Sequence, residues 1–134
     1  MSFFISRYLA LLFAIGLGIG ETIISWGHWQ FAPLWIIDYL TVVLLLYAFY
    51  KTGRPGYADT LLSAWAFTAG VFYMDLFVNL DPQLPPSMQP GRVLLALITL
   101  MLVLSLIGFF SALFAVRAKQ DPAAGATASA INRG

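Results

Sequence analysis

The chain contains no cysteine, which excludes a disulfide framework, a thiolate-ligated metal site and a cysteine nucleophile. Its single histidine, His28, excludes a haem held by two histidines of one chain. Only 10% of the 134 residues are charged, compared with roughly 25% in an ordinary soluble domain. The few Lys and Arg residues form no dense patch, so the chain lacks the clustered cations that binding to nucleic acid requires.

Apolar residues, in contrast, make up 60% of the sequence and give a mean hydropathy of +0.84. They fall into four blocks, at about residues 3–24, 33–50, 57–80 and 93–116. Each block is long enough to cross a bilayer as a helix, which satisfies its backbone polar groups within one segment. We therefore predict an all-α fold, an integral membrane four-helix transmembrane bundle formed by residues 1–119. Residues 120–134 are mostly small and are predicted to be a flexible cytoplasmic tail.

The charged residues are sorted between the two sides of this predicted bundle. If the helices run up-down-up-down, six of the seven Lys and Arg residues fall on one side and only Arg92 on the other. The side of Arg92 also carries four acids, Glu21, Asp38, Asp75 and Asp81. Because loops rich in Lys and Arg stay in the cytoplasm, both termini are predicted to be cytoplasmic, N-in and C-in. We expect a multi-pass protein of a bacterial inner membrane, in contact with membrane lipids.

Carboxylates inside the predicted spans are the first candidates for a function, because charged groups within a membrane are costly and usually face the bundle interior. In the first span, helical spacing places Glu21 on one face with Ser25 and His28. In the second span, Asp38 precedes Thr41 by three residues. Each acid also has a purely structural interpretation, as a group at the headgroup boundary that bonds to backbone N–H groups or water.

The third span carries a polar stripe of Thr68, Asp75 and Asn79, which should face protein or a cavity. In an alternating bundle Asp75 falls in the same outer layer as Glu21 and Asp38. A mixed carboxylate and imidazole site there, completed by His28, could hold a divalent cation such as zinc or manganese. The same layer could instead bind protons, and the sequence leaves the choice open. We predict Glu21, His28, Asp38 and Asp75 as a candidate cation or proton site, with Ser25, Thr41, Thr68 and Asn79 as supporting polar residues.

Small residues spaced four apart favour close packing of membrane helices. Three such pairs occur within the predicted spans: Gly16 and Gly20, Ala66 and Gly70, and Gly108 and Ala112. They could pack the bundle itself or an interface with another chain.

The sequence contains no complete catalytic set, so no catalytic residue is predicted and an enzyme is not expected. We expect a non-enzymatic accessory subunit or a homo-oligomeric bundle, which would contact itself or another membrane subunit. The alternative is a cation- or proton-coupled transport or binding protein that uses the outer acids. A second alternative is a membrane enzyme that acts on a lipid.

Overall fold

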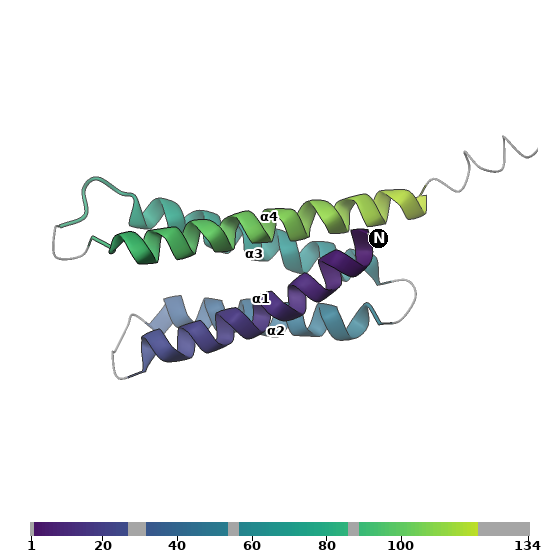
Figure 1. Cartoon of the computed structure of the whole chain (residues 1–134), viewed down its shortest axis with the longest axis horizontal. Helices are drawn as coiled ribbons and strands as arrows, with labels where there is room; N and C mark the ends of the chain where they lie inside the picture. The colour runs from purple at the N-terminus through teal and green to yellow at the C-terminus, as the bar shows by residue number, and fades with distance from the viewer. Residues whose placement is uncertain (1, 27–31, 54–56, 86–88, 121–134) are drawn as a thin grey trace, which may run out of the picture.

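The computed structural model describes residues 2–26, 32–53, 57–85 and 89–120. Within them the chain forms four helices, and the predicted all-α class is confirmed (Figure 1). The helices are α1 (Ser2–Ser25), α2 (Ala32–Lys51), α3 (Ala58–Asn79) and α4 (Arg92–Gln120). Helix α4 continues about one turn past the predicted end of its apolar block, because Arg117 and Ala118 are good helix formers. The predicted tail lies outside the described residues, apart from Gln120.

Three of the described helices are long and apolar enough to cross a membrane, over Phe3–Ile23, Ala58–Asn79 and Arg92–Ala118. Helix α2 contains 20 residues, and the side chains of its first three lie outside the described part. Large apolar side chains cover the outside of all four helices. Leu12, Val43, Met74 and Phe114 are each more than 60% exposed. An exposed apolar surface of this extent fits contact with lipid.

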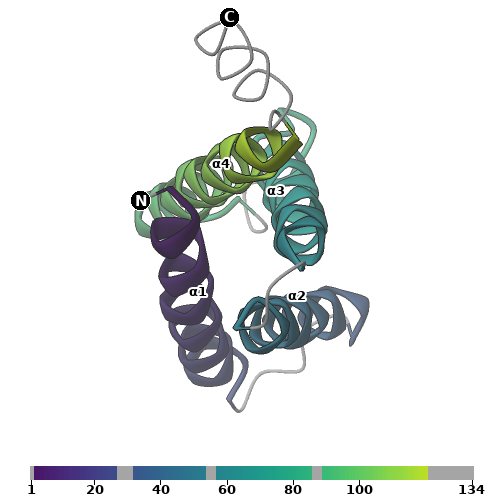
Figure 2. The same ribbon diagram turned by 90° about the vertical axis from the view of Figure 1, so that its right-hand side faces the viewer.

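The helices are arranged as a ring in which each helix packs against its two neighbours. Helix α1 contacts α2 and α4, and α3 contacts α2 and α4 (Figure 2). A smaller contact joins α1 to α3, whereas α2 and α4 do not touch within the described residues. In Figure 1 the end of α1, the beginning of α2, the end of α3 and the beginning of α4 all lie at the left. We call this the acidic end, for the carboxylates described below.

An aromatic cluster fills the core in the middle of the bundle. The Phe13 ring of α1 packs edge-on against both Trp65 and Phe72 of α3, with 5.5 Å between ring centroids in each pair. The Trp65 side chain is fully buried and lies directly against Gly108 of α4, where a Cβ atom would overlap the indole ring. The Ser6 hydroxyl donates a hydrogen bond to the Gly108 carbonyl oxygen at 3.0 Å. Gly108 therefore joins α1, α3 and α4 at one point.

Candidate functional site

Glu21 and Asp38 each continue the buried face of their own helix. In α1, Leu17 is buried, and Glu21, one turn later, is half-buried. In α2, Asp38 is the half-buried residue among exposed neighbours, and the fully buried Thr41 follows it on the same face. Since residues three or four apart lie on one side of a helix, both carboxylates face the interior of the bundle.

Asp75 occupies the equivalent position in α3. It follows the buried Phe72 by three residues and is itself half-buried, whereas Tyr73 and Met74 between them are exposed. The side-chain amide of Asn79 donates to Asp75 Oδ1 at 2.9 Å and to the Asp75 carbonyl oxygen at 2.8 Å. This pair of bonds holds the carboxylate of Asp75 against the last turn of α3.

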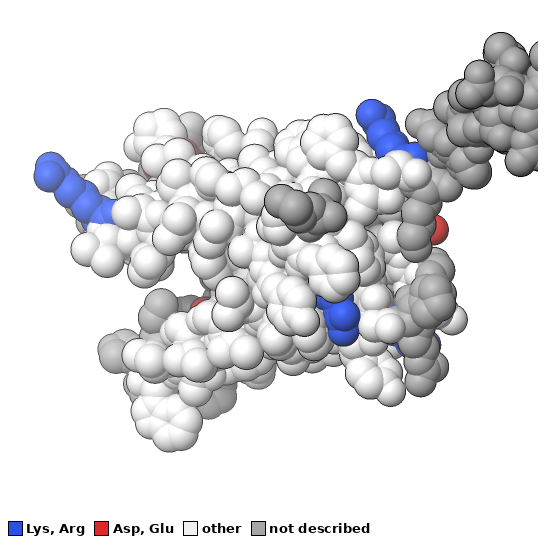
Figure 3. All heavy atoms as spheres, turned by 45° about the vertical axis from the view of Figure 1, so that its right-hand side comes forward, with Lys and Arg blue, Asp and Glu red and all other residues white. Residues whose placement is uncertain are grey.

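Three carboxylates lie at the acidic end, each half-buried and each from a different helix. We call Glu21, Asp38 and Asp75 the acidic site. In the space-filling view the molecule is hollowed at this end, between the halves formed by α3 with α4 and α1 with α2, and acidic atoms are visible beside the hollow (Figure 3). Three like charges in a partly buried layer raise the free energy of the fully ionised state, which a bound cation or proton would lower.

A hydrogen bond between α1 and α2 fixes the spacing of the first two acids. The hydroxyls of Thr22 and Tyr39 are 2.8 Å apart, and Thr22 also donates to the Gly18 carbonyl oxygen at 2.6 Å. Thr22 follows Glu21 in the chain, and Tyr39 follows Asp38, so this bond keeps the two carboxylates in one layer. Sequence reasoning missed Thr22 and Tyr39, because their only signal is their position beside the acids.

The supporting hydroxyls are satisfied within their own helices. Thr41 donates to the Ile37 carbonyl oxygen at 2.9 Å, and Thr68 donates to the Ala64 carbonyl oxygen at 2.8 Å. Bonds of this kind occupy the single hydroxyl proton, so neither residue offers a donor to the acidic site. Both hydroxyls are buried, and they lie on the same helix faces as Asp38 in α2 and Asp75 in α3.

Two further polar residues of this end lie apart from the site or outside the described part. Asp81 is exposed and its Oδ1 accepts the Gln83 backbone N–H at 2.8 Å, which makes it a turn residue. His28 and the side chain of Ser25 lie outside the described residues, so their predicted share in the site stays a prediction. Among the described residues, no three His, Cys, Asp or Glu side chains form a group that could hold a metal ion.

The three pairs of small residues lie in different surroundings. Gly108 and Ala112 are packed inside the bundle. Gly16, Gly20 and Gly70 have nothing within 4 Å of the position that a Cβ atom would take, and Ala66 is exposed. The small residues of α4 therefore pack inside the bundle, whereas those of α1 and α3 lie beside open surface.

Comparison with known protein families, with curated proteins and with solved structures gives no match.

Proposed function

We propose that the protein is a four-span membrane protein that binds a monovalent cation or a proton at the acidic site. The observation that carries the proposal is the placement of three half-buried carboxylates, from three different helices, at the same end of the bundle. Such a layer is costly when fully ionised, and uptake of positive charge removes the cost. Carboxylates placed only for helix capping or for contact with headgroups would have no reason to be half-buried on three helices at one end.

The aromatic cluster supports a site that opens at one end only. Phe72 lies one turn below Asp75 and packs on Phe13, which in turn packs on Trp65. These rings separate the acidic site from the opposite end of the bundle, so a cation would enter and leave through the acidic end. Passage across the membrane would require the three rings to move apart.

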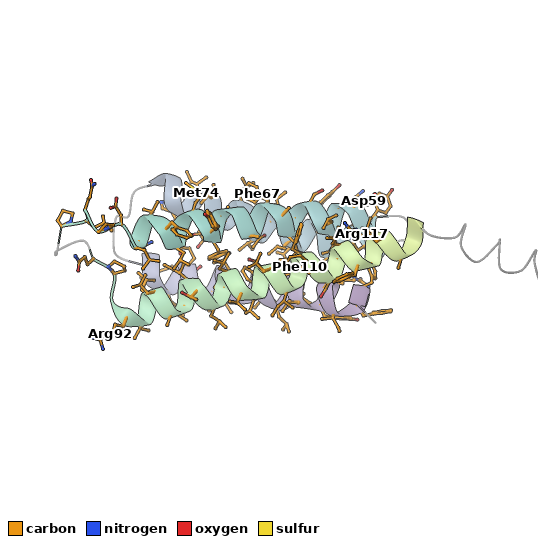
Figure 4. All side chains as sticks on the ribbon, turned by 90° about the horizontal axis from the view of Figure 1, so that it is seen from above. Asp59, Phe67, Met74, Arg92, Phe110 and Arg117 are labelled. Carbon is orange, nitrogen blue, oxygen red and sulfur yellow. The ribbon has the colours of Figure 1, made fainter. Side chains whose placement is uncertain are left out.

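In the proposed topology four spans alternate across a bacterial inner membrane, with both termini in the cytoplasm and the acidic site facing outward. The distribution of charges supports this orientation. Arg92 lies at the acidic end, and Arg117 lies at the opposite end with Asp59 (Figure 4). A reporter enzyme fused after Lys119 is expected to be active only in the cytoplasm, and activity outside the cell would contradict the orientation.

The binding proposal predicts that cations stabilise the purified protein through the acidic site. Thermal unfolding in detergent would be compared in sodium chloride and in potassium chloride, with N-methylglucamine chloride as reference at one ionic strength. A ligand present at about 100 times its Kd stabilises by roughly 2.7 kcal/mol, so at least one of these ions should raise the melting temperature. Proton release on adding the ion, followed with a dye in weak buffer, would show that the ion displaces bound protons.

The control is the triple variant Glu21→Gln, Asp38→Asn, Asp75→Asn, which keeps the shapes of the side chains and removes the charges. Its melting temperature should not respond to the ions. An equal response in the triple variant would exclude the acidic site, and a wild-type protein that neither responds nor releases protons would contradict the proposed function.

A second candidate, an accessory subunit or homo-oligomer, is supported by the open surface beside Gly16, Gly20 and Gly70. Small residues that face outward let another helix approach closely, which is how membrane helices associate. Native mass spectrometry from a mild detergent should then report more than one chain, and Gly70→Leu should reduce the assembly to a monomer. A wild-type protein that is monomeric and has no partner chain would contradict this second candidate.

A further inference from the structure

At the end of the bundle opposite the acidic site, Arg7 of α1 is held between α1 and α2. Its Nε donates to the Phe49 carbonyl oxygen at 3.3 Å, and its Cζ lies 4.6 Å from the centroid of the Phe49 ring. The side chain also passes close to Gly53, because a Cβ atom there would be 3.1 Å from Arg7 Nη2. The guanidinium is therefore fixed in position by a carbonyl, a ring and a glycine.

The charge of Arg7 is only partly compensated. Among the described residues it pairs with no carboxylate, and its contacts are the Phe49 carbonyl oxygen and the rings of Tyr8 and Phe49. The C-terminus of α2 offers about half a negative charge, which leaves a positive remainder on a half-buried group. The Thr52 hydroxyl lies 3.1 Å from the same carbonyl oxygen, but its shorter hydrogen bond, at 2.6 Å, goes to the Ala48 carbonyl oxygen.

The two Nη groups of the Arg7 guanidinium can bind a phosphate. Nε is used by Phe49, whereas the two Nη groups have no hydrogen-bond partner among the described residues. A guanidinium binds phosphate through paired N–H groups in a fixed fork, and its geometry is already set here by the protein. Arg7 also lies near the end of a membrane span, at the depth where lipid headgroups are found.

Two exposed tyrosines at the same end of the bundle provide aromatic surface that a lipid can contact. Tyr8 beside Arg7 is 52% exposed, and Tyr50 at the end of α2 is 66% exposed. Tyr8 also packs against Phe49, with 6.0 Å between ring centroids. Aromatic side chains with a polar tip favour the boundary between headgroup and acyl chain. An anionic headgroup can therefore reach Arg7 while its acyl chains lie on apolar surface.

We propose that Arg7, where it joins α1 to α2, binds the phosphate of one anionic phospholipid. The site is independent of the acidic site and is a specific contact, unlike the general attraction of a membrane surface for cations. In the proposed orientation the lipid belongs to the inner leaflet.

The test uses the full chain in native mass spectrometry, with phosphatidylglycerol and phosphatidylcholine of matched acyl chains added in equal amounts. Wild-type protein should retain one phosphatidylglycerol in preference to phosphatidylcholine. Arg7→Gln should lower that retention about tenfold, as expected for the loss of one charge-assisted pair. Lys51→Gln is the matched control. Its ammonium lies between the Tyr47 and Tyr57 rings, at 5.5 and 5.4 Å from their centroids, and these are not the rings that Arg7 contacts.

A second measurement needs no variant, which matters because Arg7 also holds α1 to α2. Photoactivatable phosphatidylglycerol reacted with wild-type protein should label residues 4–8 and 49–53. The proposal would be overturned by labelling spread evenly along the helices. It would also be overturned by wild-type protein with no preference between the lipids, or by equal losses in Arg7→Gln and Lys51→Gln.

Discussion

Gly108→Ala is expected to destabilise the bundle by about 1–3 kcal/mol, which is the usual cost of forcing one extra carbon into a packed core. The added Cβ would overlap the Trp65 ring, which is fully buried and held by Phe13. The ring is fully buried in a packed core, so we expect α3 and α4 to separate. The same displacement would strain the hydrogen bond from Ser6 to the Gly108 carbonyl oxygen. Thermal unfolding in detergent, followed by circular dichroism, measures the change.

Gly16→Ala and Gly70→Ala are the matched controls. Both glycines are in helices and have nothing within 4 Å of the added carbon. Alanine is favoured over glycine inside a helix by roughly 0.5–1 kcal/mol, so both variants should be as stable as wild type or more stable. Equal losses at all three positions would show that Trp65 does not pack against Gly108 as described.

Asp38→Asn is expected to stabilise the fold while it weakens cation binding. Asp38 shares the acidic end with Glu21 and Asp75, so removal of its charge should relieve repulsion between like charges. At an effective dielectric constant of about 20, two like charges repel by about 4 kcal/mol at about 4 Å and by less at larger separations. In the proposed four-span topology Asp38 lies within the second span, and loss of a charge there adds to the stabilisation. The melting temperature without added cation should therefore rise, and its increase on adding the cation should shrink.

Asp59→Asn is the comparison for this second prediction. Asp59 is also an acid in α3, but it is exposed and lies in the first turn at the opposite end of the bundle. There its negative charge interacts favourably with the helix dipole. Its removal should therefore leave the cation response intact and should not raise the melting temperature. A rise in melting temperature with Asp59→Asn, or a loss with Asp38→Asn, would show that repulsion within the acidic site is not the cause.

Much of the architecture could be predicted from the sequence, because the length of an apolar block is a strong signal. The four blocks correspond to four helices with ends that differ by only a few residues. The position of Glu21, Asp38 and Asp75 at one end of the bundle followed from the same count along the helices. The burial of each side chain did not follow from that count, because it depends on how each helix is rotated about its axis. That rotation is set by packing partners such as Phe13 and Phe72, which a single sequence does not pair.

The contact between Trp65 and Gly108 is a second feature that could not be predicted from the sequence. In sequence, the Gly108 and Ala112 pair has the same four-residue spacing as Gly16 and Gly20. Only the α4 pair faces the core, because a large indole from α3 lies opposite it. The matching of a large residue to a small one across helices is a tertiary property. The bond between Thr22 and Tyr39 was missed for the same reason.

Cysteine cross-linking gives the most direct test that the three carboxylates converge, and the natural chain contains no cysteine that would interfere. The pairs Glu21→Cys with Asp38→Cys, and Asp38→Cys with Asp75→Cys, would be treated with a short bis-thiosulfonate reagent in membranes. Ile23→Cys with Ile36→Cys is the control pair, since both isoleucines are more than half exposed on the outside of the same helix pair. The two acidic-site pairs should cross-link within one chain and the control pair should not. Cross-linking of the control pair alone, or of no pair, would contradict a shared acidic site.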